Sequence, residues 1–332
     1  MNSLSESRAV SIVERSPGLR AEAVEIVVIV PTFRRPTQIL ETLATLKAQE
    51  TKRRFAVIVI ENDADGREGA TAAAPLFSSG ALDGLVIVAH DRGNCSAYNA
   101  GMETALVQFP HFARLAIIDD DEFAAADWLE RLCAASETFG ADIVGGPQLP
   151  VFAEPRHAHF ARHPVFAPPY AESGPVPALY SSGNLMIGRQ VLAAMPAPFL
   201  DTRFNFMGGG DSDFLSRAAA RGFRLARCAQ ASVRETVPAR RVEADWIRAR
   251  ALRNGVISTL VQKKKLGGTA RGNAVVILKS LALLAASPWR GVAAMLRSRS
   301  VSIGLYPVYV GAGRVLAEFG YANEQYRQPE KN

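Results

Sequence analysis

Residues 25–37 read EIVVIVPTFRRPT, and this stretch decides the fold. The run from Glu25 to Val30 is rich in β-branched residues and is ended by Pro31, which is the pattern of a strand buried on both faces. From Pro36 onward, apolar residues recur at helical spacing, which predicts an amphipathic helix. The stretch therefore predicts a strand, a polar turn and a helix in direct succession.

The same alternation of strand and helix patterns continues through the first half of the chain. Further strands are expected at Phe55–Ile60, Leu85–Ala89 and Arg114–Ile118, with helical patterns between them. After the last of these strands, Asp127 and Glu130 have the spacing of a capping box for the next helix. This order predicts a parallel sheet with helices on its faces. Because such sheets bind ligands at the carboxyl ends of their strands, the polar residues there form the candidate site.

The remainder of the chain divides into less regular regions. Residues 1–22 carry charges throughout and lack an apolar segment, which predicts a flexible leader and no secretory signal. Residues 23–255 are expected to form the α/β domain, whose last helix runs from Glu243 to Asn254 and is ended by Gly255. Residues 256–332 are expected to form a basic, amphipathic helical region.

The net charge of +6 is unevenly distributed along the chain. Residues 240–332 hold 16 Lys and Arg against 5 Asp and Glu, a local charge of +11, so residues 1–239 carry −5. An acidic front half argues against nucleic acid as the substrate, whereas the basic region suits RNA, an anionic membrane surface or solvent. Three scattered cysteines fit a reducing compartment, which indicates a cytoplasmic protein.

Two apolar stretches lie in the basic region, at Asn273–Ala286 and Leu305–Phe319. The first is interrupted by Lys279 and is shorter than the about 20 apolar residues that span a bilayer, so no transmembrane helix is expected there. Both stretches are weakly amphipathic. They are therefore expected either to pack on the α/β domain or to lie on a membrane surface.

Three adjacent aspartates, Asp119, Asp120 and Asp121, directly follow the strand that ends at Ile118. Neighbouring carboxylates repel one another, so their ionisation is unfavourable without a cation. Carboxylate oxygens suit Mn²⁺ or Mg²⁺, which commonly bridge carboxylates and substrate phosphates. A solvated acidic turn is the alternative, but the position at a strand end favours a metal-dependent site.

A second acidic segment, GGGDSD, extends from Gly208 to Asp213. Its glycines allow the backbone to approach a ligand closely or to adopt positive φ. Asp211 and Asp213 are explained either as favourable charges in the first turn of a helix or as parts of a catalytic site. Together with the distant aspartate triad, the segment favours a general-base role for Asp211.

Further polar residues follow the strand that ends at Ala89. Arg92, Asn94 and Asn99 lie in and after a loop that leads into a helix, where a phosphate or a nucleotide base can be bound. Any tight strand–helix connection has a similar composition, so this signal is weak by itself. The five histidines form no metal-binding pattern.

Six motifs occur in order along the chain: VIVPTFRRP, VIENDADG, DRGNCSAYNAG, AIIDDDE, SSGNLMI and MGGGDSDF. The ordered set resembles the family 2 glycosyltransferases of the GT-A fold, a Rossmann-like, mostly parallel α/β sheet flanked by helices. It is most similar to bacterial exopolysaccharide members of the succinoglycan-biosynthesis type, over residues 24–255. The resemblance implies an inverting, metal-dependent hexosyltransferase that uses a nucleotide-sugar donor, a UDP-sugar, and a glycan or lipid-linked oligosaccharide acceptor.

The resemblance also implies a role for each matching residue. Asp119 and Asp121 would be the DxD pair that approaches the ribose and ligates Mn²⁺ or Mg²⁺, and Asp211 would be the catalytic base. The nucleotide-sugar would be bound by Pro31, Thr32, Phe33, Arg35, Glu61, Asp63, Asp91, Arg92, Asn94, Asn99, Asp119, Asp120 and Asn184.

Two residues depart from the family pattern. Glu61 stands where the family usually has Asp, which alters the pocket for the nucleotide base, and Gly210 stands where it has the Glu before the general base. A catalytically silent sugar-nucleotide-binding protein is therefore an alternative. A sugar nucleotidyltransferase would share the fold and the acidic site, but the segment PTFRRP lacks the glycines of its phosphate-binding loop.

Acceptors in pathways of this kind resemble lipid-linked oligosaccharides. We therefore expect a peripheral membrane contact through the basic C-terminal region, at the inner face of the cell membrane. The QxxRW motif of processive synthases is absent from the sequence, which favours the addition of a single sugar.

Overall fold

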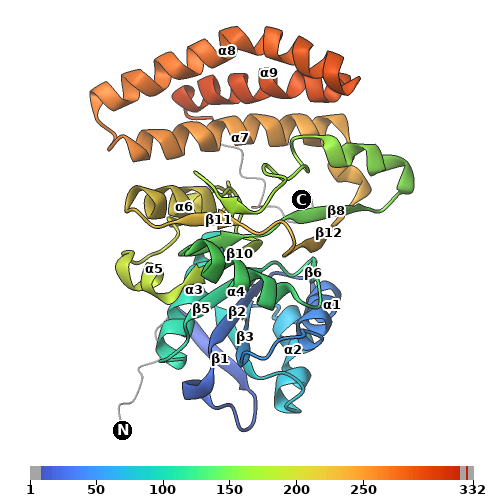
Figure 1. Ribbon diagram of the computed structural model, residues 1–332, viewed down its shortest axis with the longest axis vertical. Coiled ribbons are helices and arrows are strands. Elements are labelled where there is room, and N and C mark those ends of the chain that lie inside the picture. Colours follow the sequence, from blue (N-terminus) through green and yellow to red (C-terminus); the bar gives the residue numbers. More distant parts are fainter. Residues whose placement is uncertain (1–8, 322–326, 328–332) are drawn as a thin grey trace. The chain divides into compact units, whose positions relative to one another are not determined.

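The computed structural model describes residues 9–321 and residue 327. Within the chain, two compact units are distinguished, and their elements are labelled in Figure 1. The first unit contains the α/β sheet and comprises Met1–Gln148, Tyr170–Asn205 and Gly210–Glu235. The second contains the C-terminal helices and comprises Leu149–Pro169, Phe206–Gly209 and Thr236–Asn332.

A nine-stranded sheet forms the centre of the first unit, with the strand order β1-β4-β3-β2-β5-β10-β7-β11-β9. Its strands are β1 (Val10–Arg15), β2 (Ile26–Thr32), β3 (Phe55–Glu61), β4 (Gly84–Ala89), β5 (Arg114–Ile118), β7 (Ile143–Gly145), β9 (Gly174–Pro175), β10 (Asn184–Gly188) and β11 (Leu225–Arg227). Two further short strands, β6 (Glu122–Ala124) and β12 (Val233–Val237), pair antiparallel with each other. One more strand, β8, spans Gln148–Phe152.

The middle of the sheet, β4-β3-β2-β5, is parallel, as the alternating pattern predicts. Its strands are apolar except at their ends because both faces are covered, and Ile26 to Val30 have no exposed surface. The helices of this unit are α1 (Pro36–Lys47), α2 (Glu68–Ser78), α3 (Asn94–Gln108), α4 (Trp128–Phe139), α5 (Arg189–Ala194) and α6 (Gly210–Ala220). The α/β class and its parallel centre are thus confirmed.

Two local expectations for this unit are wrong. Within the expected flexible leader, β1 pairs antiparallel with β4, with Val10 opposite Ala89. The pattern VSIVER was too short to predict a strand that owes its place to backbone pairing at a sheet edge. Asp127 precedes α4 but caps nothing with its side chain; it pairs with Arg131, and Glu130 accepts a hydrogen bond from Thr51.

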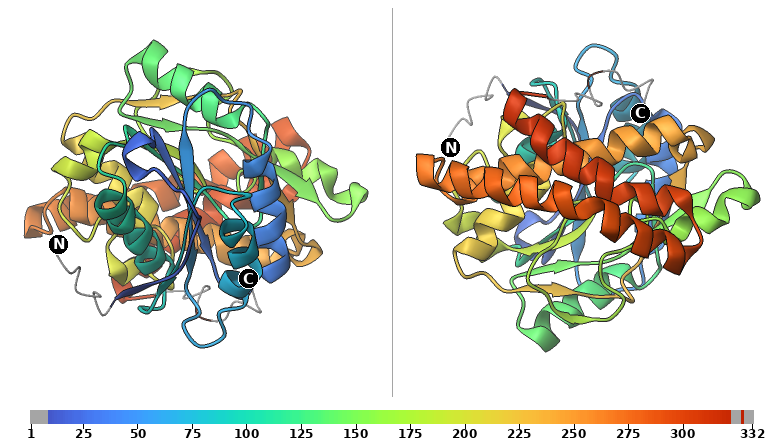
Figure 2. Two further views of the ribbon diagram at one scale, coloured as in Figure 1. Left: turned by 90° about the horizontal axis from the view of Figure 1, so that it is seen from below. Right: turned by 90° about the horizontal axis from the view of Figure 1, so that it is seen from above.

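In the second unit, α9 (Val301–Leu316) packs against both α7 (Ala244–Lys265) and α8 (Ala270–Ser298). Figure 2 shows α8 and α9, coloured orange to red, side by side. The expected helix end at Gly255 is wrong, because α7 continues through it. A side chain at Gly255 would overlap the backbone of α9 at Val310, so this glycine permits close helix packing instead of ending the helix. The expected domain boundary at residue 255 therefore falls inside α7.

The helix α8 is also longer than expected. By length and composition it is the one helix among the described residues that could cross a membrane, and only 22% of its most apolar window is buried. This corrects the expectation drawn from the shorter stretch Asn273–Ala286, since the helix continues through Pro288 to Ser298. Length and composition alone do not distinguish a spanning helix from other apolar helices.

Candidate active site

The carboxyl ends of the parallel strands bring the predicted site residues to one edge of the sheet. Thr32, the last residue of β2, lies opposite Glu61, the last residue of β3. The Thr32 hydroxyl donates a hydrogen bond to Asp120 Oδ2 at 2.8 Å, which joins the end of β2 to the turn after β5. Segments far apart in the sequence therefore meet here.

Arg35 is the counter-ion of the aspartate triad. Its Nη1 donates to Asp120 Oδ1 and to Asp121 Oδ2, both at 2.8 Å. Burial lowers the pKa of Arg35, but the charges of Asp120 and Asp121 outweigh it and hold the pKa above its usual value. The need of this turn for a cation, predicted from the sequence, is thus met in part by a guanidinium.

Burial makes ionisation of the remaining carboxyl groups of the triad unfavourable. Burial, and after it the negative charge of Asp121, raise the pKa of Asp119 to about 7. Burial also raises the pKa of Asp120 to about 6, although Arg35 opposes the effect. A cation bound at this turn would therefore favour the ionised carboxylates.

Three residues that the sequence analysis missed support Asp119. The Tyr98 hydroxyl donates to Asp119 Oδ1, and the Asp119 amide donates to Glu122 Oε2 at 3.0 Å. Gln148 donates in turn to Glu122 Oε1. Burial and the charge of Asp119 raise the pKa of Glu122 well above its usual value. Glu122 follows the triad directly, which was an available signal; nothing in the sequence pattern indicated Tyr98 or Gln148.

Glu61 and Asp63, which were predicted to bind the nucleotide, both contact other residues of the chain at the end of β3. Glu61 has no exposed surface, and its two carboxylate oxygens accept from the amides of Asp63 and Ala70, at 2.9 and 3.0 Å. Asp63 forms an ion pair of 2.6 Å with Arg34. The side chain of Glu61 therefore stabilises the β3–α2 turn through backbone amides. Asp63, in contrast, forms an ion pair with a side chain.

Asn62, which lies within the segment Glu61–Asp63 expected to line the nucleotide pocket, links the ends of two strands. Its amide nitrogen donates to the carbonyl of Asp91 at 2.9 Å, and its oxygen accepts from the amide of Gly93 at 2.7 Å. These bonds fix the loop after β4. Asp91 and Arg92 are exposed on that loop and Asn94 is exposed at the start of α3, where a ligand can reach them.

Phe33 lies between two cations at the same edge. The guanidinium groups of Arg34 and Arg92 each lie 5.0 Å from the centre of its ring, which is the geometry of a cation–π contact. Phe33 and the preceding Pro31 are half-buried. This part of the edge combines an aromatic surface with positive charge, and both properties suit a nucleotide.

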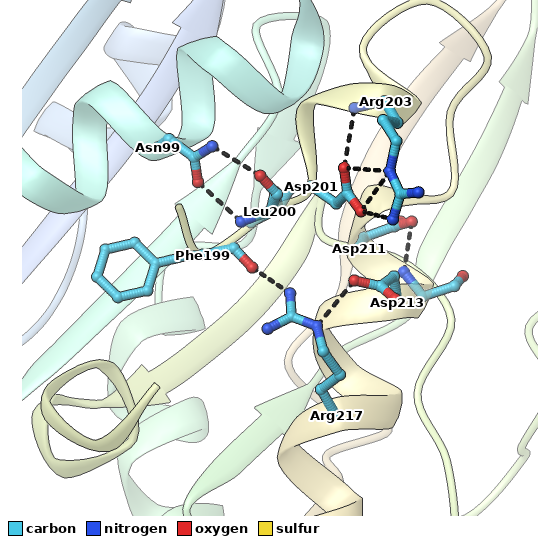
Figure 3. A network of polar contacts seen from close by, with 9 residues as sticks. Asn99, Phe199, Leu200, Asp201, Arg203, Asp211, Asp213 and Arg217 are labelled. Atoms are coloured by element: carbon cyan, nitrogen blue, oxygen red, sulfur yellow. Dashed lines mark hydrogen bonds and ion pairs between the residues drawn. The ribbon is translucent and has the colours of Figure 1, made fainter. Parts of the chain in front are cut away.

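The second acidic site is built on a loop and the start of α6 (Figure 3). Asp213 is buried and pairs with Arg217 at 2.8 Å, and Arg217 also donates to the carbonyl of Phe199. Asp201 binds Arg203 through both carboxylate oxygens. Asp211 is half-buried, and its Oδ1 accepts from the Ser212 amide at 2.7 Å. Asp213 is buried and Asp211 is half-buried, so the two aspartates of the GGGDSD segment differ in their exposure.

One turn of α3 contacts both acidic sites. Cys95 lies against the start of α6, because a side chain at Gly210 would overlap its sulfur. Tyr98 binds Asp119, and Asn99 exchanges two hydrogen bonds of 2.8 Å with the backbone of Leu200. Residues three and four apart face the same side of a helix, so this turn fixes the second site relative to the first. Asn99, predicted to hold the nucleotide, thus holds the loop.

Asn184 is also fully engaged. Its oxygen accepts from Trp128 Nε1 at 2.8 Å, and its nitrogen donates to the carbonyls of Pro147 and Ala231, at 3.0 and 2.8 Å. The preceding Gly183 packs on the acidic turn, since a Cβ there would lie 2.8 Å from Asp119 Oδ2. Of these two residues, Gly183 therefore offers its backbone beside the triad.

The aspartate triad fits a cation that is bound together with a substrate. Within residues 9–321 and at residue 327, no three His, Cys, Asp or Glu side chains converge as a complete metal site. Asp119 and Asp121 nevertheless each keep one carboxylate oxygen outside the hydrogen bonds described above. Mg²⁺ and Mn²⁺ typically take one or two carboxylates and complete their coordination with phosphate oxygens and water.

Comparison with known proteins identifies the family of the chain. The model of the family "Glycosyl transferase family 2" matches residues 27–194. The succinoglycan biosynthesis protein ExoM of Rhizobium meliloti (strain 1021) is 30% identical over 245 residues, which cover 70% of this chain and 74% of that protein.

Solved structures resemble the fold. The mannosyltransferase PcManGT from Pyrobaculum calidifontis, in complex with GDP-Man and Mn²⁺, has a TM-score of 0.56 at 18% identity, covering 91% of this chain and 89% of that chain. Residues 1–349 of TarS from S. aureus, in complex with UDP, have a TM-score of 0.50 at 14% identity, covering 92% of both chains.

Proposed function

The chain belongs to glycosyltransferase family 2, and we propose that it is an inverting, metal-dependent hexosyltransferase that transfers a sugar from a UDP-sugar to a glycan or lipid-linked oligosaccharide. One observation carries the proposal: a single turn of α3 links the aspartate triad to the segment that holds Asp211. A direct displacement needs a donor site and a base held in fixed relation, because both act on one reaction centre.

The donor would bind along the edge of the sheet. Phe33 and Arg92 offer an aromatic face and a positive charge to the nucleotide, and Asp63 lies beside them through Arg34. Asp119 and Asp121 would hold Mn²⁺ or Mg²⁺. Once bound, the cation would neutralise negative charge on the departing nucleoside diphosphate.

Asp211 would accept the proton from the attacking hydroxyl of the acceptor. In the same step, the acceptor oxygen forms a bond to the anomeric carbon and the bond to the diphosphate oxygen breaks, which inverts the configuration. Asp213 is a poorer candidate for the base, because it is buried. The half-buried position of Asp211 at the start of α6 supports this choice.

The relatives support the choice of substrates. The name of ExoM places that protein in succinoglycan biosynthesis, so we propose a role in exopolysaccharide or cell-surface glycan synthesis. One structural relative was captured with GDP-Man and Mn²⁺ and the other with UDP, and the second of these ligands is the nucleotide of the donor proposed here. A lipid-linked acceptor would place the enzyme at the inner face of the cell membrane, with the basic C-terminal region as its contact.

A catalytically silent sugar-nucleotide-binding protein is the second candidate. It is favoured by Gly210, which replaces the family's carboxylate at a position where Cys95 leaves no room for a side chain. The packing of Cys95 against Gly210 therefore excludes a carboxylate side chain next to Asp211. Only a measurement of turnover separates the two candidates.

The deciding experiment incubates the purified protein with UDP-, GDP- and dTDP-sugars in Mn²⁺ or EDTA. Nucleoside diphosphate release is measured with and without membrane-extracted lipid-linked acceptor. Metal-dependent release from one donor, stimulated by the acceptor, is the expected result. Binding of one nucleotide without turnover would establish the silent binder, and the absence of both would contradict the proposed function.

A further inference from the structure

Four of the five buried residues of α8 are glycine or serine, the fifth being Val276, whereas several of its large apolar residues are exposed. Its buried positions include Gly272, Ser280, Ser287 and Gly291. Its exposed positions include three large apolar side chains: Leu278 is 67% exposed, Trp289 80% and Leu296 72%. A helix that faces only water has the opposite distribution, because exposed apolar surface gains nothing there.

Close backbone packing explains the small residues. A Cβ at Gly291 would lie 2.5 Å from the carbonyl oxygen of Gly304 in α9, and a Cβ at Gly311 would lie 3.1 Å from the Cα of Leu284. The two helices therefore touch through their backbones, and Figure 2 shows them side by side. Larger side chains of α8, such as Leu284 and Met295, pack where glycines of α9 make room for them, and the remaining large side chains of α8 face outward.

Most of the exposed large apolar residues of α8 lie on one side of the helix, and the other two, Val275 and Ile277, flank that side. At about 100° per residue, positions separated by three, four, seven, eleven and eighteen residues return to the same side of a helix. We define the α8 stripe as Ala274, Leu278, Leu281, Ala285, Trp289, Val292 and Leu296. At the start of α9, Val301 adds another exposed side chain, with 64% of its surface accessible.

Positive charge flanks the α8 stripe on one side. Lys279, Arg290 and Arg297 are spaced by 11 and 7 residues, so they lie above one another and about 100° from the stripe. From Trp246 to Ala317 the sequence holds 12 Lys and Arg and no Asp or Glu. This surface therefore complements negative charge together with an apolar phase.

We propose that the α8 stripe lies in the interfacial layer of an anionic lipid bilayer, with the helix parallel to the membrane plane. Lys279, Arg290 and Arg297 reach the lipid phosphates, while Leu278, Trp289 and Leu296 enter the acyl boundary. Tryptophan favours this depth because its ring is amphipathic. The inference deepens the proposed function, on which it rests for its purpose, since a lipid-linked acceptor is found at the same surface.

Two other occupants fit the observations less well. A transmembrane orientation would carry Lys279 and Arg290 into the hydrocarbon core, because the uncharged run between them is 10 residues, against the about 20 that span it. A second copy of the chain would bring two basic flanks together in a region without carboxylates. Like charges at such an interface are unfavourable.

The test measures binding of the full chain to vesicles of phosphatidylcholine alone or with one-quarter phosphatidylglycerol. Of the three tryptophans, Trp128 has no exposed surface and Trp246 is half-buried, so Trp289 is the natural probe. We expect its emission to move to shorter wavelength with the anionic vesicles, and we expect added NaCl to weaken this binding. The combined Leu278→Gln and Leu296→Gln variant should bind at least tenfold more weakly.

A matched control is Val107→Gln, which alters a side chain that is 57% exposed on α3 of the other unit. It should bind the vesicles as the unaltered chain does. All variants should keep the melting temperature of the unaltered chain, because the changed side chains are exposed. Lys279→Gln with Arg290→Gln should weaken binding at low salt and flatten its salt dependence.

Several results would overturn the inference. One is an unchanged Trp289 emission with anionic vesicles; another is a dimer in solution that the Leu278 and Leu296 variant dissociates. Tight membrane attachment that resists high salt and requires detergent would show a spanning helix instead. Nucleoside diphosphate release with a soluble acceptor is measured on the same preparations, so loss of catalysis and loss of vesicle binding are separate outcomes.

Discussion

The central sheet and the paired helices α8 and α9 bury opposite kinds of side chain. In the sheet, β-branched residues such as Val28 and Ile58 have no exposed surface. In α8, glycine and serine are buried, while Leu278 and Trp289 face outward. Burial of apolar surface contributes about 25 cal/mol per Å² in water, so the sheet has realised this gain and the α8 stripe has not. The difference indicates that α8 meets an environment other than water.

The two regions also treat charge differently. Around the aspartate triad, carboxylates and guanidinium groups are paired within the site, as Arg35 is with Asp120 and Asp121. The stretch from Trp246 to Ala317 has basic residues only. The first arrangement suits catalysis inside one unit, and the second suits attraction to an external anionic surface. The predictions below therefore separate chemistry and stability in the sheet from binding by α8.

The largest effect is expected for Asp211→Asn. Loss of a general base lowers turnover by about 10²–10⁴-fold, whereas nucleotide binding should stay within about twofold. Nucleoside diphosphate release and nucleotide titration measure the two quantities. Asp245→Asn is the control, because the Asp245 side chain is 85% exposed on α7. Equal loss of turnover and nucleotide binding would contradict the base assignment, and vesicle binding should not change in either variant.

Truncations in the two regions should differ in their effect on stability. Ile58→Ala leaves a cavity in the sheet and should lower the free energy of unfolding by about 2–5 kcal/mol. Leu278→Ala removes an exposed side chain and should change it by less than about 0.5 kcal/mol in the absence of lipid. Denaturant unfolding of both variants tests the comparison. A large loss for Leu278→Ala would mean that the stripe is covered in solution.

Asp121→Ala should weaken donor binding only when metal is present. Removal of one of two proposed ligands should cost about 10–100-fold in affinity for Mn²⁺ with the nucleotide. Titration with Mn²⁺ and in EDTA separates this effect from direct contact. An unchanged affinity in both conditions would remove Asp121 from the metal site. Glu68→Ala, which alters an exposed carboxylate at the start of α2, provides the control.

The smallest effect is expected from pH. The pKa of Asp119 is about 7 in the folded chain against 3.8 in the unfolded one, so the folded state holds its proton longer. Unfolding then releases a proton, and stability falls as pH rises from about 4 through 7. The melting temperature of the metal-free protein should drop by a few degrees between these values, less so in Asp119→Asn. Asp83→Asn, at an exposed position, should retain the full drop.

Local sequence pattern predicted the elements that carry the site. The β-branched runs gave β2, β3, β4 and β5 to within about two residues, because strands buried on both faces must be apolar throughout. The position of Thr32, Glu61 and Asp119 at one sheet edge follows from parallel strands alone. Residues whose partners lie far away in the sequence escaped prediction: Tyr98 and Gln148 acquire their roles only through contacts with Asp119 and Glu122.

The binding, metal and base assignments stay predictions, and the structure adds contacts within the chain for several of the predicted residues. Asn99 and Asn184 were selected for a ligand, and both use their amide groups to hold backbone segments. Arg35 was selected for the nucleotide, and it neutralises Asp120 and Asp121. A motif identifies which residue types are needed at a site, whereas their hydrogen bonds depend on the packing around them.

The sequence by itself determined the family, the α/β class and the edge of the sheet at which the polar residues meet, because these depend on local patterns and on the order of motifs. Only the tertiary structure decided that β1 joins the sheet, that α7 continues through Gly255 and that α8 turns its large apolar side chains outward. The physical reason is the same in each case. Strand pairing at an edge, close approach of helix backbones and the choice of a buried helix face all depend on contacts between distant segments, which no local periodicity contains.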